Sequence, residues 1–484
     1  MTRNTFFILL FIFLDSLSQN SIQIIESNKL EKIIVDQENV QKLSGNVIIN
    51  YADMTIYLDT MIINSTNTKL NGWGNVNINN DSIFIKSDSI FLLKDKEKIY
   101  FFNNVSFNND TVCIETNYLE YDFQNEIIKY KDGGKVTMQE STTYSNQLIY
   151  NKPLRISHFF DNVVSSQKEY KIISKDLIIQ DSIIKFNDTT TLKNNEYTIT
   201  FNNGYRNKNT QIESLNNIEL INEKHIITAD KLSRNNKKNV NIFHQNVLIK
   251  IDSSNYILGD TLIQNNKTSH VTGNSTFKIQ NDSDLILISG DTISIRKENQ
   301  LDIKNNVKIR GDVMNGECTN MTINQDDELI EMLGEPVLWF NKTQLTGEKI
   351  ILFTTKNKID SIYVPKYPFI LERMDSIKYY NQITGNKLEG NIENYKVRQL
   401  VLTGNAKMKY FQLLNNKQTI GLNDILASKI EINFKEDQIS NLNCIQEINS
   451  HYIEFNHTNQ SKEDKKTLFI DGVERKYQEY FISK

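Results

Sequence analysis

The stretch HIITADKLSR (225–234) places a small residue before an aspartate, Asp230, with alternating apolar residues on both sides. The same pattern returns in NYILGDTLIQ (255–264) and again in ILISGDTISI (286–295). Successive aspartates in these stretches are 30 and 31 residues apart. A fixed period of this size is typical of stacked repeat proteins.

This pattern extends over most of the chain, with an acid or an asparagine at each repeat and usually Gly, Ala, Ser or Thr just before it. The first three of these positions are separated by 29 residues each. Asparagine is abundant, so a single match means little, but the regular series predicts a repeat array. The positions are Asp59, Asp88, Asn117, Asn146, Asp176, Asn203, Asp230, Asp260, Asp291, Asn320, Glu348 and Asn386.

Apolar residues alternate before each acid and alternate again after it, but in the opposite phase. Met54 and Ile56 precede Asp59, for example, and Met61 and Ile63 follow it. A period of two predicts β-strands with one buried face. A phase slip of one residue is typical of a β-bulge or corner, where Gly and Asn tolerate the backbone angles. We therefore expect the acids to hydrogen-bond the local backbone rather than to take part in chemistry.

A turn precedes the first strand of each repeat, as in SGNVIIN around Val47 and KNNVKIR around Val307. Each repeat is thus a bent strand pair of roughly 28 residues with turns at both ends. We predict an all-β fold, an elongated repeat β-jelly roll in which two antiparallel sheets face each other across a narrow apolar interior. The free strand edges at the ends of such sheets must be covered or used for pairing.

The chain has 484 residues, of which 39% are hydrophobic and 24% charged, with a formal net charge of −4. This balance provides no basic face, so nucleic acid is not expected as a partner. At the N-terminus, Arg3 is followed by an apolar run from Phe6 to Leu14 and by a small-x-small motif at 16–18. This layout predicts a secretory signal peptide at 1–18; the alternative is a buried N-terminal element. No other apolar run approaches the length of a transmembrane helix.

The sequence carries no recognisable catalytic or metal-binding motif. Cys113, Cys318 and Cys444 are widely spaced, which fits a single bridge or three inert thiols rather than a CxxC site. His451 and His457 would lie roughly 20 Å apart on one strand, too far to share an ion. We therefore expect no catalytic residue, no metal and no cofactor.

The recurrent GNVxI and A-D-x-L unit, with the signal peptide and the opposed sheets, resembles the OstA-like (organic solvent tolerance) family. That family includes the periplasmic bridge of lipopolysaccharide transport in Gram-negative bacteria. The segments LGEPVLWFNKTQLTGEKIILFTTKNKIDSIYV (333–364) and NQITGNKLEGNIENYKVRQLVLTGNAKMKYF (381–411) resemble the longer, multi-repeat members. The resemblance implies a V-shaped β-jelly roll that binds lipopolysaccharide acyl chains between its sheets and stacks end to end.

This resemblance implies a non-enzymatic periplasmic protein of the cell envelope that binds lipopolysaccharide, or another acylated lipid, and conducts it toward the outer membrane. Implied partners are other lipopolysaccharide-transport components, joined by edge-strand stacking, or further copies of the chain joined head to tail. Two alternatives stay open: a β-repeat scaffold whose outer faces bind a protein or glycan, and a repeat-fold carbohydrate-active enzyme. The even spread of charge along the chain disfavours the enzyme.

We expect the signal peptide to be followed by OstA-like repeats at 19–330, a second OstA-like segment at 331–455 and a charged tail at 456–484. The spacing of the acids widens to 38 before Asn386, around YVPKYPF (363–369), which departs from the shorter family members.

Inward-facing residues on either side of the corners are candidates for a lipid-binding groove between the sheets. An apolar slot can hold an acyl chain without any polar site, because each buried methylene contributes about 0.8 kcal/mol. The alternative for each residue is that it packs in a dry core. The candidates are Ile56, Ile85, Ile114, Leu119, Ile227, Leu232, Ile257, Leu262, Ile288 and Ile293.

Overall fold

A computed structural model describes the chain from residue 22 to residue 454. The positions left out within that span are 81, 281–284, 297–298, 313, 341, 356–357, 374–379, 394–395, 415–417 and 437. The predicted signal peptide at 1–18 and the predicted tail at 456–484 therefore lie outside the described residues. Apart from one short 3-10 helix, Lys94–Lys96, every regular element in the described part is a β-strand, which confirms the all-β prediction.

The chain divides into two compact units, Met1–Asn209 and Thr210–Lys484. The boundary predicted between 330 and 331 stays a prediction. The strands of the first unit are β1 (Gln23–Glu26), β2 (Lys29–Val35), β3 (Glu38–Tyr51), β4 (Met54–Asn64), β5 (Lys69–Asn79), β6 (Ile83–Leu93), β7 (Lys98–Asn109), β8 (Val112–Asp122), β9 (Ile127–Tyr130), β10 (Gly134–Met138), β11 (Ser141–Ser145), β12 (Gln147–Asn151), β13 (Ile156–Ser166), β14 (Lys171–Gln180), β15 (Ile183–Phe186), β16 (Thr190–Lys193), β17 (Tyr197–Phe201) and β18 (Asn203–Asn207).

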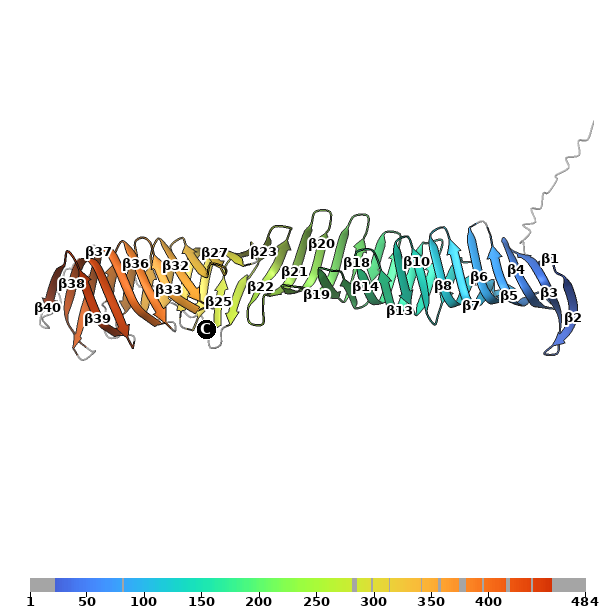
Figure 1. The fold of residues 1–484 in the computed structure, drawn as a ribbon, viewed down its shortest axis with the longest axis horizontal. Helices are drawn as coiled ribbons and strands as arrows, with labels where there is room; N and C mark the ends of the chain where they lie inside the picture. The colour runs from blue at the N-terminus through green and yellow to red at the C-terminus, as the bar shows by residue number, and fades with distance from the viewer. Residues whose placement is uncertain are drawn as a thin grey trace, which may run out of the picture. The chain divides into compact units, whose positions relative to one another are not determined.

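The second unit continues the same strand pattern (Figure 1). Its strands are β19 (Ile212–Asn222), β20 (Ile226–Asn235), β21 (Val240–Lys250), β22 (Tyr256–Gln264), β23 (Ser269–Thr272), β24 (Thr276–Gln280), β25 (Leu285–Ser289), β26 (Thr292–Ile295), β27 (Gln300–Gly311), β28 (Met314–Asn324), β29 (Leu329–Leu333), β30 (Val337–Phe340), β31 (Thr343–Thr346), β32 (Lys349–Thr355), β33 (Lys358–Val364), β34 (Phe369–Arg373), β35 (Tyr380–Thr384), β36 (Lys387–Glu393), β37 (Lys396–Leu414), β38 (Gln418–Lys435), β39 (Gln438–Ile445) and β40 (Asn449–Glu454).

Neighbouring strands are antiparallel, and the pairing slips at the predicted corner of each long strand. Between β4 and β5 the register runs through Tyr57 and resumes only at Thr60, opposite Trp73. The skipped residues on β5 include Gly74 and Asn75, whose φ angles are +83° and +49°. Left-handed angles of this kind suit Gly and Asn, and two of them in succession bend the strand. The predicted phase slip at each small-acid pair is therefore a real corner.

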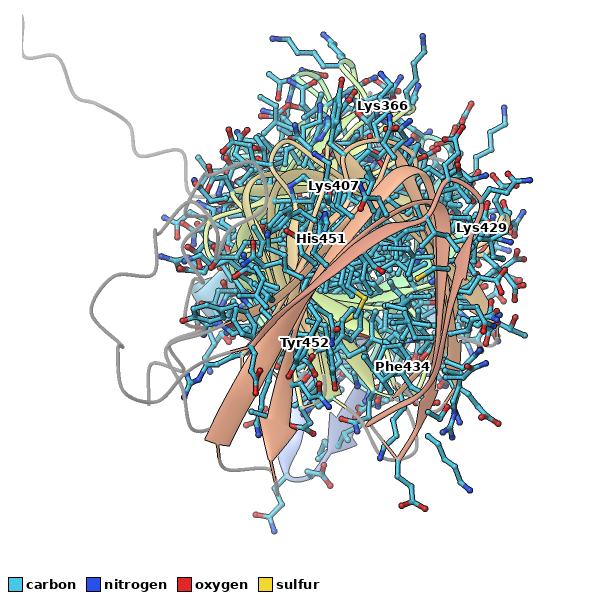
Figure 2. The ribbon with its side chains drawn as sticks, turned by 90° about the vertical axis from the view of Figure 1, so that its left-hand side faces the viewer. Lys366, Lys407, Lys429, Phe434, His451 and Tyr452 are labelled. Atoms are coloured by element: carbon cyan, nitrogen blue, oxygen red, sulfur yellow. The ribbon has the colours of Figure 1, made fainter. Side chains whose placement is uncertain are left out.

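The corners divide every long strand into two halves, and the halves form two facing sheets. We call the row of corners the apex. The hairpins then fall into two rows: rim 1, which includes 51–54, 79–83 and 109–112, and rim 2, which includes 64–69 and 93–98. Figure 2 looks into the C-terminal unit, where Lys366 lies at the top of the arch while Phe434 and Tyr452 lie on opposite arms. The predicted pair of opposed antiparallel sheets is confirmed.

Asparagine has two structural roles in this fold, which explains much of its abundance. At the apex, the Asn75 amide donates to the Asp59 carboxylate (2.8 Å), and Asn246 and Asp230 repeat the bond (2.8 Å). At the rims, an asparagine side chain closes the hairpin, as where Asn80 Oδ1 accepts from the Ile83 N–H (2.7 Å). The expectation that the acids bond the local backbone was therefore wrong in detail, because these carboxylates reach a side chain on the next strand.

Candidate functional site

The ten predicted groove residues all face the interior and are 0–2% exposed. In the first unit they belong to rows of side chains that pair across successive strands. One row runs through Ile49, Ile56, Ile78, Ile85, Phe107, Ile114 and Val136. Leu119 lies on the opposite sheet, paired with Phe101. The structure thus brings Ile56, Ile85 and Ile114 into one continuous apolar row.

The second unit contains two such rows, one on each sheet. The remaining six predicted groove residues all belong to these two rows, and every residue of both rows is buried. The first row runs through Leu220, Ile227, Ile249, Ile257, Phe277, Ile288 and Ile309. The second runs through Leu215, Leu232, Phe243, Leu262, Val271, Ile293 and Ile303.

Sequence reasoning named no groove residue between Leu119 and Ile227, although the interior continues there. The row of the first unit that ends above at Val136 continues through Thr143, Ser165, Ile172, Leu192 and Ile199. The alternating pattern around Ile172 could have predicted that this residue faces the interior. Thr143 lies in STTYS (141–145), which carries no apolar alternation, so a search for apolar rows passes over it.

Hydroxyl side chains interrupt the apolar interior in this part of the first unit. Thr143 and Ser165 are fully buried, and the Thr143 hydroxyl donates to the Ser165 hydroxyl at 2.9 Å. Ser174 and Thr190 make a second pair at 2.8 Å. Ser174 and Thr190 also bond the backbone carbonyls of Asp176 and Asp188, and these hydrogen bonds lower the cost of burying the hydroxyls. The interior thus changes from purely apolar to locally polar while it stays closed.

The mouth between rim 1 and rim 2 is closed by side chains. Tyr51 of rim 1 meets Phe123 of rim 2, with ring centroids 5.3 Å apart. Further along, the Ser157 hydroxyl lies 3.7 Å from the Met138 sulfur. Backbone hydrogen bonds outside the strands, within the described part of the chain, run along a rim or along the apex and not from rim to rim. The two rims can therefore separate without breaking a backbone bond.

Burial raises the pKa values of the tyrosines that close the interior. Burial is the main cause for Tyr51, helped by the nearby carboxylates Glu97 and Asp95, and its pKa rises to about 12. The pKa of Tyr130 also rises to about 12 through burial, although its hydrogen bond to Ser145 opposes the shift. Tyr121, beside Phe123, has its pKa raised by burial as well. These phenols stay neutral at physiological pH.

One charged pair lies inside the second unit. Glu213 and Arg234 are directly opposite each other on β19 and β20, with 3.4 Å between Oε2 and Nη1. Both are almost fully buried, and Arg234 Nε also donates to Asn241 (3.0 Å). Their cross-strand row continues through Asn241 and Gln264, so it forms a polar row beside the apolar ones.

Chemistry at metal or thiol centres has no support in the described residues. There, no three His, Cys, Asp or Glu side chains are arranged to hold a metal ion. The three cysteines are free thiols, and burial raises the pKa of Cys318 to about 12. His158 bonds Asp176 (2.8 Å), and His457 lies outside the described residues. Within the described part of the chain, no helix is long and apolar enough to cross a membrane.

Each unit contains a segment that matches a known family. Residues 19–175 match the family described as OstA-like protein. Residues 226–358 match the family described as LptA/(LptD N-terminal domain) LPS transport protein. A segment of the first unit is therefore similar to OstA-like proteins and a segment of the second to the LptA/LptD N-terminal family, which confirms the predicted resemblance and its β-jelly-roll fold. The second match is to a transport family, as expected for a non-enzymatic protein.

Among solved structures, the chain matches LptH, the LptA-homologous periplasmic component of the lipopolysaccharide transport device from Pseudomonas aeruginosa. The identity is 14%, and the match covers 28% of this chain and 93% of that chain, with a TM-score of 0.23. A TM-score this low carries no weight for the fold. Comparison with curated proteins found no match.

Proposed function

We propose that this chain is a periplasmic protein that binds lipopolysaccharide acyl chains between its two sheets and conducts them toward the outer membrane. The observation that carries the proposal is the unbroken apolar row on each sheet of the second unit, the unit that contains the lipopolysaccharide-transport domain match. The predicted signal peptide at 1–18 supports export to the periplasm.

An acyl chain gains on the order of 10 kcal/mol when its methylenes leave water, and an apolar row can supply the surface. Successive rungs present similar side chains, so movement from rung to rung changes this free energy little. Because side chains close the interior, an acyl chain can enter only when rim 1 and rim 2 separate. Side-chain contacts between the rims, such as that of Tyr51 with Phe123, then break. The acyl chain packs against each apolar row in place of the side chains of the opposite sheet.

Free strand edges in each unit support stacking with other transport components or with further copies of the chain. In the described residues, β2 pairs only with β3, and it leaves Leu30 and Ile34 exposed. In the second unit, β39 pairs only with β38, and Ile445 is exposed. An unpaired apolar edge is a template for another strand.

The test places an aliphatic diazirine residue at Ile257 and, in a matched protein, at Leu258. Ile257 is fully buried in the interior row, whereas Leu258, its neighbour on β22, faces outward and is exposed. Illumination in a lipopolysaccharide-producing bacterium is expected to give lipid adducts at 257 and none at 258. Thermal unfolding of both proteins checks that each one folds.

Equal labelling at the two positions, or no lipid at 257 in a folded protein, would contradict the transport proposal. The sealed interior would then be a dry core, and the scaffold alternative would hold.

A further inference from the structure

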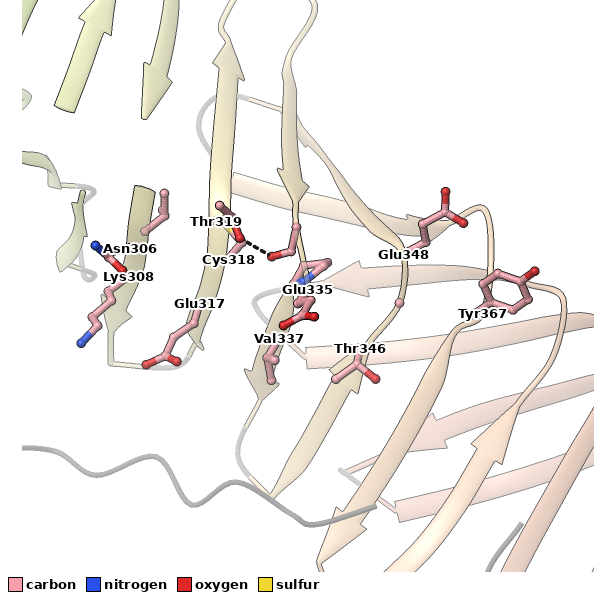
Figure 3. A pocket seen from close by; sticks show the side chains of 14 residues that line it. Asn306, Lys308, Glu317, Cys318, Thr319, Glu335, Val337, Thr346, Glu348 and Tyr367 are labelled. Atoms are coloured by element: carbon pink, nitrogen blue, oxygen red, sulfur yellow. Dashed lines mark hydrogen bonds between the residues drawn. The ribbon is translucent and has the colours of Figure 1, made fainter. Parts of the chain in front are cut away.

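A surface pocket of about 610 Å³ lies on the apex of the second unit, away from the interior rows (Figure 3). It is lined by the corner residues of β27, β28, β30 and β31 and by Tyr367, in the turn between β33 and β34. The turn belongs to YVPKYPF (363–369), where the regular spacing of the repeats breaks. The transport proposal gives this pocket no role.

The two successive corners that border this pocket hold other residues in place of the asparagine–aspartate bond. At several other corners an asparagine in the left-handed region donates to the aspartate of the neighbouring strand, as Asn306 does to Asp291 (3.0 Å). Here the equivalent residues are Glu335 and Tyr367, with φ angles of +54° each. Neither side chain can repeat the amide-to-carboxylate bond. Instead, the Thr319 hydroxyl donates to the Gly334 carbonyl (3.0 Å) at the first corner, and Lys366 lies 3.5 Å from Glu348 at the second.

Tyr367 is unusual in conformation and in exposure. Of the described residues with positive φ, it is the only aromatic one, and a left-handed angle is unfavourable for a bulky side chain. Its side chain is 71% exposed, so no burial offsets this strain. Strained residues and exposed tyrosines both concentrate at binding surfaces.

The charges around Tyr367 favour a basic partner. Glu317, Glu335 and Glu348 line the pocket together with one lysine, Lys308. Lys366 lies 3.5 Å from Glu348, and Lys308 is directly opposite Glu317 on the neighbouring strand, so the three glutamates face two lysines. The lining is therefore net negative, and a lysine or arginine entering it would also meet the face of an exposed aromatic ring.

We propose that this pocket docks a basic peptide segment of a partner protein, with Tyr367 as the aromatic anchor and the glutamates as its charge complement. The occupant is a Lys/Arg-rich segment of another protein, because the negative charge of the pocket favours a basic segment over an acidic or purely apolar one. The site is on the outside of the sheets, so it operates whether or not lipid fills the interior.

The test measures fluorescence anisotropy of two labelled peptides, GKRWKRG and GEEWEEG, titrated with the purified full chain. The basic peptide is expected to bind, with affinity that falls as salt rises, and the acidic peptide is not. Tyr367→Asn, which suits the left-handed corner, is expected to weaken binding at least tenfold while the melting temperature stays equal or rises. Tyr57→Asn, at an exposed tyrosine of β4 in the first unit, is the matched control and is expected to leave binding unchanged.

Three results would overturn the proposal. One is no binding of the basic peptide, or equal binding of both peptides. Another is unchanged binding in Tyr367→Asn together with a lower melting temperature, which would make Tyr367 a structural residue. The third is a self-associated chain that Tyr367→Asn dissociates in sedimentation, which would make the occupant a second copy.

Discussion

Tyr51 and Phe123 meet edge to face across the mouth of the first unit, with their ring planes at 87°. One ring comes from rim 1 and the other from rim 2, so this aromatic contact holds together two rows of hairpins that no backbone bond joins in the described part of the chain. The Tyr51 hydroxyl is buried there without a hydrogen-bond partner. The contact that closes the mouth is thus well packed, but it leaves the Tyr51 hydroxyl without a hydrogen bond.

Replacing Tyr51 with Phe is expected to stabilise the first unit by about 1 kcal/mol, because the change removes a buried hydroxyl that makes no bond. Tyr130→Phe is the matched control, since the Tyr130 hydroxyl bonds Ser145 at 2.5 Å, and that change is expected to destabilise. Thermal unfolding of the two variants measures both effects. A lower melting temperature for Tyr51→Phe would show that its hydroxyl has a partner.

Stability is expected to fall between about pH 10 and pH 12. The folded-state pKa values of Tyr51 and Tyr130 are about 12, above the ordinary value of 10, so the unfolded chain loses these protons first. The stabilisation is fully present below pH 10 and is lost as the pH rises through the folded-state values. Denaturant unfolding across this range measures it, and Tyr51→Phe is expected to flatten the decline. A decline that is the same in Tyr51→Phe would exclude a contribution from Tyr51.

Gly74→Ala is expected to destabilise more than Gly133→Ala. Both glycines have left-handed angles, at +83° and +99°, so both substitutions cost about 1–2 kcal/mol in backbone strain. A Cβ at 74 would also lie 2.5 Å from the Asp59 carboxylate, whereas a Cβ at 133 meets nothing within 4 Å. Chemical denaturation of the two variants isolates the packing part. Equal losses would mean that Asp59 moves away freely.

The hydroxyl pair inside the first unit is expected to behave as one unit. Thr143→Val or Ser165→Ala alone leaves a buried hydroxyl without its partner and is expected to cost about 1–3 kcal/mol. The double variant is expected to lose less than the sum, because it removes both polar groups together. A double-mutant cycle in thermal unfolding measures the coupling. Additive losses would show that the two hydroxyls do not depend on each other.

Much of this fold could be predicted from the sequence because its two signals are local. Alternation around Ile56 and Ile257 identifies inward faces, and the small-acid pairs mark the corners that the register shifts confirm. The contact of Tyr51 with Phe123 could not be predicted, since it depends on how far one sheet is offset from the other. Nor does a period of two reveal that Gln344 and Gln382, in the opposite phase to the interior row, are also buried.

Where it forms, the asparagine–aspartate bond at the apex joins a strand only to its neighbour along the array. A tandem duplication of one strand pair therefore includes the asparagine and the aspartate of its own hydrogen bond. A deletion of one strand pair removes both partners together. Chains built on this plan can change their reach in small, equal steps during evolution, because no distant residue has to change in compensation.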